Sequence, residues 1–413
     1  MLSNAYDAAM AMRQANLFYE HPAGSIVDQL SAFTYEGKRT ERIDNGDVPY
    51  FYNEFWTARQ RDAHPLQEVS YRACFKAQLP EFFIKRLTEV GDRVYDPFMG
   101  RGTTLIQAAL MGRDPVGNDV NPISKFLCRP RICPPTIGAI ADRLRLLDWQ
   151  PTHEHDDELL VFYHPETLRE IMALRQYLLR REAEGSIDPV DDWIRMVALN
   201  RLTGHSPGFF SVYSLPPNQA VTLKAQIRIN EKRGQIPPRR HVAEIILKKS
   251  RSLLKDGVPP KVTAQFSTGP AESTPDVASA SVNLVVTSPP FLDIVQYAAD
   301  NWLRCWFAGI DVGGVEIAMH RKAESWQSFV RSTFEELERV VRPGGHVAFE
   351  VGEVRNGKVE LDKIVLEAIR GLAFEPLLVL INVQEFTKTA NVWGVNNNAK
   401  GTNTNRIILA RRL

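Results

Sequence analysis

Three features are missing from this chain of 413 residues, and each absence excludes a class of protein. No run of about 18 apolar residues occurs, so the sequence predicts no membrane-spanning helix. The first residues lack the basic segment and apolar core of a secretory signal. The four cysteines are too few and too scattered for a disulfide framework. We therefore expect a cytoplasmic protein without a membrane partner.

Metal-binding patterns are also scarce. Cys128 and Cys133 precede His153 and His155, but no C-x-x-C pair occurs, and the spacing matches no common structural zinc site. The sequence therefore predicts no metal centre.

The chain has little net charge, because 50 lysines and arginines stand against 49 aspartates and glutamates, which gives a formal charge of +1. A near-neutral total argues against a partner as acidic as nucleic acid. The charges are nevertheless sorted along the chain. Residues 142–192 carry a net charge of −7, and residues 195–255 hold 12 basic side chains against two acidic ones. This basic block is either a solvated helix face or a surface for a polyanion.

Short apolar runs that end in turn residues alternate with helical patterns near both ends of the chain. This alternation is typical of a parallel sheet covered by helices, so we expect an α/β fold. Residues 136–256 carry helical patterns and form too long an excursion for a simple crossover, so we interpret them as an inserted, mostly helical subdomain. The insertion contains the whole basic block. The expected strands are 93–95, 115–118, 262–266, 282–287, 346–351, 377–383 and 406–410.

The first motif with chemical content lies at the end of the first expected strand. Residues 94–104 read V-Y-D-P-F-M-G-R-G-T-T and lead into a helical pattern. A glycine pair at a strand-to-helix turn lets the backbone pass close to a ligand and points free N–H groups at its acidic part. Asp119 follows the second strand, where doubly wound nucleotide sites place a carboxylate on ribose hydroxyls. The alternative is a tight turn with a helix N-cap, and spacing alone leaves both open.

The second motif ends another apolar strand. Residues 283–291 read N-L-V-V-T-S-P-P-F. Two prolines remove two N–H donors and stiffen the turn, so its carbonyl groups can face a pocket without competing donors. The aromatic ring that follows offers a stacking surface. An ordinary strand exit with a core phenylalanine is the alternative.

Together the two motifs resemble those of the S-adenosylmethionine-dependent amino methyltransferases of DNA, which methylate the exocyclic nitrogen of cytosine or adenine. Residues 96–104 match the cofactor motif D-P-F-x-G-x-G-T-T, and residues 288–291 match the catalytic motif [DNS]-P-P-[YFW]. Residues 75–80 lie where that family has the segment that closes over the methionine part of the cofactor.

The resemblance implies a Rossmann-like, seven-stranded methyltransferase sheet with a target-recognition insertion. Residues 1–135 would form the N-terminal segment and the cofactor-binding half, residues 136–256 the insertion, and residues 257–413 the catalytic half.

The implied cofactor is S-adenosyl-L-methionine. Asp96 would accept hydrogen bonds from its ammonium group, and Asp119 would bind both ribose hydroxyls. The glycines would let the cofactor approach the backbone. The implied cofactor-binding residues are Phe75, Asp96, Phe98, Gly100, Gly102, Thr103 and Asp119.

The implied reaction moves a methyl group from a sulfonium to a poorly nucleophilic amino nitrogen, so orientation is the enzyme's main task. The Ser288 hydroxyl and the Pro289 carbonyl would each accept one N–H of the amino group. Phe291 would stack on a base flipped out of the duplex. The implied catalytic residues are Ser288, Pro289, Pro290 and Phe291.

The first residue of the catalytic motif bears on the target base. In this family a serine there is associated with cytosine N4, and an aspartate more often with adenine N6, so we expect cytosine N4 with adenine N6 as the alternative. Methylation at carbon 5 would need a Pro-Cys pair, and residues 133–134 have the reverse order. Residues 265–268 lack the acidic residue that the family often directs at the adenine ring of the cofactor.

The resemblance also implies double-stranded DNA as the substrate and allows a cognate restriction endonuclease as a partner. We expect the insertion to contact phosphates and read bases, with Asn218, Gln226 and Arg228 available for base edges. Two alternatives are an amino methyltransferase of RNA and a catalytically silent protein that binds nucleic acid. The expected DNA-binding residues are Arg228, Arg233, Arg239, Arg240 and Lys248.

Two aromatic segments each allow two interpretations. Residues 53–56 and 59–61 either contact DNA or pack the N-terminal segment. Residues 293–307 form an aromatic and polar helical stripe, which is either core or a pocket wall that includes Tyr297 and Asn301.

Overall fold

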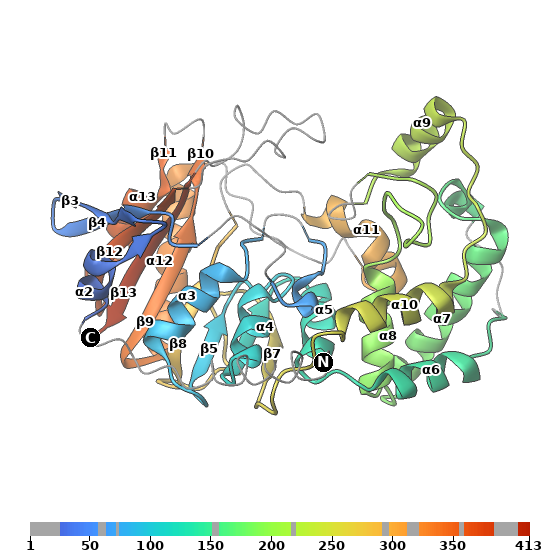
Figure 1. The fold of residues 1–413 in the computed structure, drawn as a ribbon, viewed down its shortest axis with the longest axis horizontal. Coiled ribbons are helices and arrows are strands. Elements are labelled where there is room, and N and C mark those ends of the chain that lie inside the picture. The colour runs from blue at the N-terminus through green and yellow to red at the C-terminus, as the bar shows by residue number, and fades with distance from the viewer. Residues whose placement is uncertain are drawn as a thin grey trace, which may run out of the picture.

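A nine-stranded sheet forms the centre of the protein in a computed structural model (Figure 1). The structure describes residues 25–56, 63–71, 74–150, 157–215, 220–290, 297–311, 322–354, 359–383 and 404–413. In chain order the strands of the sheet are β3 (Glu41–Asn45), β4 (Val48–Asn53), β5 (Arg93–Asp96), β6 (Asp114–Asp119), β7 (Gln265–Thr268), β8 (Val282–Thr287), β9 (Val341–Val351), β12 (Phe374–Val383) and β13 (Thr404–Arg412).

The spatial order of the strands is β3-β4-β12-β13-β9-β8-β5-β6-β7. Neighbours from β9 to β7 run parallel, whereas β13 is antiparallel to both β9 and β12. The seven strands from β12 to β7 are the seven expected from the sequence, which confirms the Rossmann-like α/β fold. The strand expected at 346–351 begins earlier, because β9 includes residues 341–345, and its register with β8 shifts in this first part.

Two strands extend the sheet beyond the expected seven. β4 pairs in parallel with β12 through Tyr50 to Asn53, and β3 pairs antiparallel with β4. Pro49 makes the segment a poor strand by its sequence, because proline lacks an N–H donor. The ladder to β12 begins at the next residue, so the missing donor costs no hydrogen bond there. A short helix α2 (Ile26–Ala32) and the hairpin β1 (Thr34–Tyr35) and β2 (Lys38–Arg39) precede these strands.

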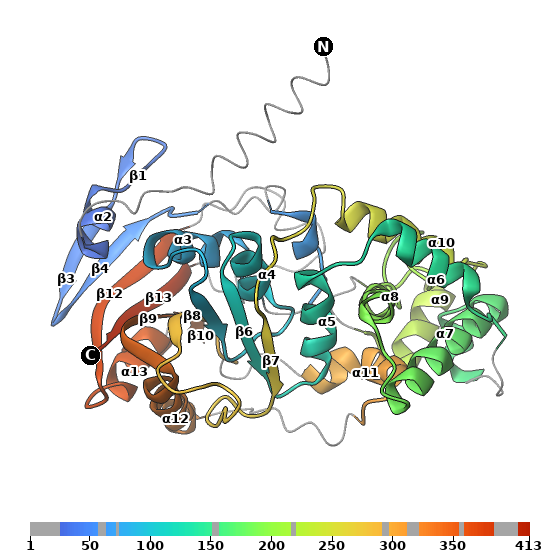
Figure 2. The same cartoon turned by 90° about the horizontal axis from the view of Figure 1, so that it is seen from below.

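Helices cover both faces of the sheet (Figure 2). Successive side chains of β8 point to opposite faces. Leu284 and Val286 pack in the same core as α3, whereas Val285 packs with α12 and α13. The helix bounds are α3 (Gln78–Leu87), α4 (Thr103–Leu110), α5 (Ile123–Ile132), α12 (Ala323–Val340) and α13 (Leu361–Ala368); β9 is followed by the hairpin of β10 (Glu353–Val354) and β11 (Val359–Glu360).

The segment between β6 and β7 folds into helices that gather beside the sheet, at the right of Figure 1. Its core is continuous with α5 and with α11, because Trp193 and Ile246 belong to the same hydrophobic cluster as Leu127 and Leu303. The helices are α6 (Ile137–Leu146), α7 (Pro165–Ala183), α8 (Pro189–Leu199), α9 (Leu223–Arg233) and α10 (Val242–Leu253), with the 3-10 turn η3 (Asp157–Val161); α11 (Tyr297–Ala308) follows β8 in the chain, and η2 (Pro65–Gln67) precedes α3.

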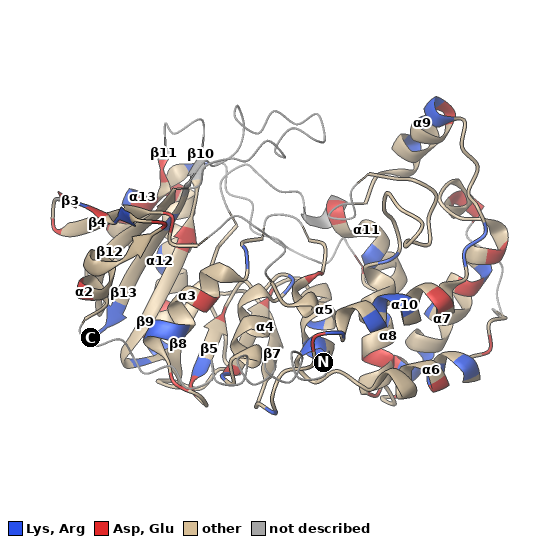
Figure 3. Cartoon of the chain, in the orientation of Figure 1, with Lys and Arg blue, Asp and Glu red and all other residues tan. Residues whose placement is uncertain are grey.

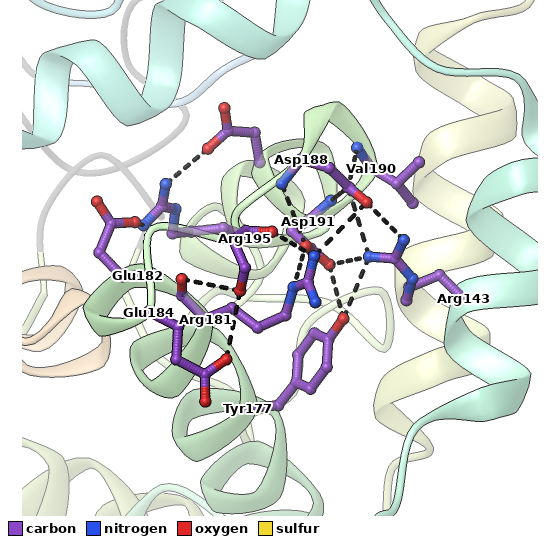
Figure 4. Close-up of polar contacts among 11 residues, drawn as sticks. Arg143, Tyr177, Arg181, Glu182, Glu184, Asp188, Val190, Asp191 and Arg195 are labelled. Carbon is purple, nitrogen blue, oxygen red and sulfur yellow. Dashed lines mark hydrogen bonds and ion pairs between the residues drawn. The ribbon is translucent and has the colours of Figure 1, made fainter.

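A network of ion pairs fastens α8 to α6 and α7 (Figure 4). Asp191 is fully buried and accepts hydrogen bonds from Arg181 Nε at 2.6 Å, from the Tyr177 hydroxyl at 2.9 Å and from Arg143. Asp188 caps α8 and lies 2.6 Å from Arg143. The acidic segment therefore neutralises arginines inside the helical region.

Arg195 opens the basic block but lies inside this region. Its side chain is 3% exposed and donates to Asp192 and Glu182, each at 2.6 Å. The two carboxylates neutralise the charge of Arg195, so its side chain contributes to the contacts between the helices.

Replacing Asp191 with alanine is expected to lower the free energy of unfolding by about 2–3 kcal/mol, because two arginines lose a buried partner. Urea denaturation followed by circular dichroism measures this change. Asp142→Ala is the matched control, since Asp142 pairs with Arg145 in an exposed i,i+3 contact. It should cost less than about 0.5 kcal/mol. Equal losses for the two variants would contradict the structural role of the network.

The N-terminal aromatic residues Phe55 and Trp56 are packed in the hydrophobic core. Phe55 and Trp56 are each 5% exposed and contact Phe82 of α3. The backbone N–H groups of Phe55 and Trp56 donate to the buried amide oxygen of Asn382 in β12. Residues 59–61 lie outside the described residues. No helix in the described part of the chain is long and apolar enough to cross a membrane.

Candidate active site

A cavity of about 420 Å³ lies at the carboxyl ends of β5, β6 and β8. Both sequence motifs contribute to its wall, although about 190 residues separate them in the chain. Parallel strands end at one edge of the sheet, which is why the motifs meet. The predicted residues that line the cavity are Phe75, Asp96, Phe98, Gly100, Thr103, Asp119, Ser288 and Pro290.

Of the other three predicted residues, two do not line the cavity, and the third lies outside the described residues. Gly102 is the N-cap of α4 with φ of 80°, and a Cβ there would lie 2.4 Å from the Cys128 sulfur. Close packing against α5 therefore requires this glycine. Pro289 is not among the lining residues, and Phe291 lies outside the described residues.

Asp96 ends β5 and is 1% exposed. Its Oδ1 accepts hydrogen bonds from the Thr287 hydroxyl at 2.6 Å and from the Phe98 N–H at 3.1 Å. Burial raises the pKa of the Asp96 carboxyl to about 7, although these two hydrogen bonds lower it. A cationic group in the cavity would restore the charged form. Thr287 belongs to β8, so this contact joins the two motifs.

Asp119 ends β6 and faces the turn that follows β5. Its two carboxylate oxygens accept the N–H groups of Gly100 and Asn121, each at 2.8 Å. Burial raises the pKa of Asp119, and the two backbone donors lower it. Each oxygen keeps a second lone pair, so both remain available to a pair of hydroxyl groups in the cavity.

Two hydrogen bonds hold the end of β8 and the turn that follows it. The Thr104 hydroxyl donates to the Val286 carbonyl at 2.9 Å, and the indole N–H of Trp326 in α12 donates to the Pro290 carbonyl at 2.9 Å. Trp326 is fully buried, so its ring cannot move away without opening the core. The turn is thereby fixed before any substrate binds.

Glu350 is a site residue that the sequence analysis missed. It lies near the end of β9, is 5% exposed, and hydrogen-bonds to the Ser288 hydroxyl. Asn405 of β13 donates its amide N–H to Glu350 Oε1 at 2.7 Å. Burial raises the pKa of Glu350, and the contacts with Ser288 and Asn405 lower it. An acidic residue inside the apolar strand V-A-F-E-V was the available signal.

Arg101 is a second missed residue. Its guanidinium donates to the Thr103 hydroxyl at 3.0 Å, to the Val69 carbonyl at 2.9 Å and to the Phe75 carbonyl at 3.3 Å. These contacts tie residues 69–75 to the glycine turn. Tyr71 and Phe75 consequently form part of the cavity wall. The family motif leaves this position open, so the motif gave no signal.

Glu272 supplies the acidic group that the third strand lacks. It lies four residues after β7 and lines the cavity together with Pro270 and Ala271. Residues 265–268 lack an acidic side chain, as the sequence shows, and Glu272 places a carboxylate on the cavity wall beyond them.

Asn301 is part of the core rather than of the cavity wall. Its side chain is 2% exposed and accepts a hydrogen bond from Arg304 at 2.8 Å, and it is not among the lining residues. Leu303 and Phe307 of the same helix pack in the core of the helical region. The side chain of Tyr297 lies outside the described residues.

The expected DNA-binding side chains lie on the helical region and away from the cavity lining. Arg228, Arg233, Arg239 and Lys248 are exposed, and Arg240 is half-buried. Gln226 is unavailable for a base edge, because it is fully buried and donates to the Tyr213 carbonyl at 3.0 Å. Asn218 lies outside the described residues. Within the described ranges no cluster of three or more His, Cys, Asp or Glu side chains could hold a metal.

Comparison with known proteins supports the resemblance carried by the motifs. Residues 18–125 match the family model described as DNA methylase. Over 74 residues the chain is 38% identical to the type II methyltransferase M.MjaII of Methanocaldococcus jannaschii, and over 97 residues it is 28% identical to M.MvaI of Kocuria varians. These segments cover 18% and 23% of this chain but only 14% and 20% of the relatives.

Among solved structures, geranyl diphosphate C-methyltransferase from Streptomyces coelicolor has a TM-score of 0.34 and 9% identity, over 82% of this chain and 76% of that one. The family model matches a segment that includes the cofactor motif at residues 96–104, and the two relatives support the resemblance to the amino methyltransferases of DNA over part of the chain.

Proposed function

We propose that the protein is a DNA methyltransferase that transfers a methyl group from S-adenosyl-L-methionine to the exocyclic N4 of cytosine in duplex DNA. One observation carries the proposal: Asp96, Asp119 and Ser288 line a single cavity at the edge where the parallel strands end. The match of residues 18–125 to DNA methylases supports the same class of substrate.

The cavity fits the cofactor in size and in chemistry. Its volume of about 420 Å³ lies within the usual range for small-molecule sites. Asp96 would face the ammonium group, Asp119 the two ribose hydroxyls, and Glu272 the amino group of the adenine ring. Phe98 and Phe329, whose ring centroids lie 5.7 Å apart, would pack beside the apolar part.

When bound, the cofactor supplies a methyl group activated by a positively charged sulfur. The chain's task is to orient the amino nitrogen of the base and to remove a proton from it. Glu350 accepts a hydrogen bond from the Ser288 hydroxyl. The lone pairs of the hydroxyl oxygen are therefore free to face the amino group of the base. Methyl transfer would form the N–C bond and break the methyl carbon–sulfur bond of the cofactor, which would leave as a neutral thioether. One N–H proton would move to Ser288 while the Ser288 proton moves to Glu350.

Trp326 supports this arrangement through the proline turn. Its hydrogen bond to the carbonyl of Pro290 holds the turn beside Pro289, whose carbonyl would accept the second N–H although Pro289 is not among the residues that line the cavity. Phe291 would stack on the flipped base. The serine at the start of the motif favours cytosine N4 over adenine N6, as it does in the family that the chain resembles.

One experiment separates the alternatives. The protein is incubated with labelled S-adenosylmethionine and duplex DNA, and the DNA is digested to nucleosides. N4-methylcytosine is the expected product. N6-methyladenine would move the target to adenine, whereas label in RNA alone, or no transfer, would refute the proposal. A restriction endonuclease that cuts the same site, and is blocked by this methylation, would be the partner.

Replacing Asp119 with alanine should weaken the binding of S-adenosylmethionine by about 10–100-fold, because two hydrogen bonds to a charged group are lost. Isothermal titration calorimetry measures this affinity. Asp114→Ala is the control, since Asp114 lies at the opposite end of the same strand and accepts the Thr263 N–H. Unchanged affinity in Asp119→Ala would refute the ribose role.

A further inference from the structure

The structure divides the basic block into parts with different surroundings. Arg201 is stacked on Phe209, with its guanidinium 4.0 Å from the ring centroid, and the Lys249 ammonium lies 2.7 Å from Glu68. α10, which carries Lys249, packs against α6, α7, α8 and η2. Four of the twelve cations, Arg195, Arg201, Arg240 and Lys249, are therefore at least partly buried, whereas the other eight, which include the four of α9, are exposed.

α9 stands out from the other helices at the upper right of Figure 1. The hairpin β10–β11 projects at the upper edge of the same view, and it follows the end of β9 that carries Glu350. α9 thus rises on the edge of the molecule where the candidate active site lies. α10 runs lower in the view, along the helical region.

The outer face of α9 carries a row of cations. Lys224, Arg228 and Lys232 are spaced four residues apart, so they lie one above another along the helix, and all three are exposed. Figure 3 colours the basic positions of α9 blue. Among the described residues no carboxylate forms an ion pair with them. Ile227 lies beside this row and is 43% exposed. Gln226 is the one residue of the helix that is buried.

The inner face of α9 is held by hydrogen bonds. Gln226 donates to the Tyr213 carbonyl at 3.0 Å and to the Asn230 amide oxygen at 2.7 Å, and Asn230 donates to the Val161 carbonyl at 2.7 Å. The Arg233 guanidinium stacks 3.8 Å from the centre of the Tyr213 ring. The cationic row is therefore presented in a fixed direction, which reduces the entropy lost on binding a polyanion.

We propose that α9 docks in the major groove of the substrate duplex, with Lys224 and Lys232 on phosphates and Arg228 on a base edge. A helix about 10–12 Å across fits a groove about 12 Å wide. Arginine in such a groove most often pairs with guanine. This inference rests on the proposed function for the identity of the duplex as substrate. Arg233 is assigned to anchoring the helix through Tyr213.

The phosphate contacts are tested by binding of the full-length protein to a fluorescently labelled mixed-sequence DNA duplex at several salt concentrations. Lys224→Ala/Lys232→Ala should bind about 10-fold or more weakly, with a salt slope smaller by about two. Lys363→Ala/Arg370→Ala, in α13 and just after its end, is the control, because it removes two exposed cations that pair with neighbouring glutamates. An unchanged slope in the α9 variant, or an equal loss in the control, would overturn the inference.

Base reading is tested by sequencing the sites methylated in genomic DNA. Arg228→Ala should accept other bases at one position of the site, with discrimination there reduced by about 10–100-fold. Unaltered selectivity would overturn the role of Arg228. The two proposals fail in distinguishable ways: absence of methyl transfer by the wild-type protein refutes the function, whereas normal transfer with α9 variants that bind and select like wild type refutes only the α9 inference.

Discussion

Replacement of Ser288 by alanine is expected to lower kcat for DNA methylation by about 10²–10³-fold. The hydroxyl is the acceptor that orients the amino nitrogen, and it is also the contact through which a proton reaches Glu350. Affinity for S-adenosylmethionine should persist, because Asp96 and Asp119 keep their partners. Single-turnover methylation and calorimetric titration of the cofactor measure the two quantities separately.

Ser281→Ala is the matched control for this variant. Ser281 precedes the same strand at its other end and donates to the Ala278 carbonyl, so the length of β8 separates it from the cavity-lining turn. It should methylate like the wild-type protein. A Ser288→Ala enzyme with normal kcat would remove the serine from the reaction, and one that loses cofactor binding would show that the substitution disturbs the cavity instead.

Replacement of Glu350 by glutamine should lower kcat by about 10–100-fold with little change in KM, because the amide cannot take up a proton. The carboxylate must be ionised to accept a proton, and burial raises its pKa. Wild-type activity should therefore fall as the pH decreases through this raised pKa. The glutamine variant should lose that acid limb, which a pH profile of kcat measures.

A double variant tests whether the two residues act together. If the proton passes through Ser288 to Glu350, then Ser288→Ala/Glu350→Gln should be little slower than Ser288→Ala alone. Independent roles would make the two losses multiply. An unchanged acid limb in Glu350→Gln, combined with multiplying losses, would leave Glu350 with only a packing role.

The seven central strands could be predicted from the sequence because each is an apolar run with its own local pattern. β4 could not, since Pro49 weakens its pattern and its pairing with β12 joins residues more than 300 positions apart. The same limit applies within the site. Asp96, Asp119 and Ser288 belong to local motifs, whereas Glu350 reaches Ser288 only because β8 and β9 are neighbours.

The basic block illustrates what composition can and cannot predict. The count of charges located the block but treated Arg195, Lys249 and Arg228 alike. The structure gives them three different surroundings: a buried ion pair, a contact with Glu68, and an exposed helix face. Which cation is exposed depends on helix packing, and packing is set by the burial of apolar faces across the whole region.

The sequence by itself determined the class of sheet, the position of the glycine turn, and the carboxylates and serine that both motifs contribute. Those features follow from short-range patterns, because strands, turns and caps are specified by neighbouring residues. Only the tertiary structure decided that Arg101 and Glu272 line the cavity, that Glu350 contacts Ser288, and that the cations of α9 are exposed. Strand order and helix packing bring such residues together, and both arise from contacts between distant parts of the chain.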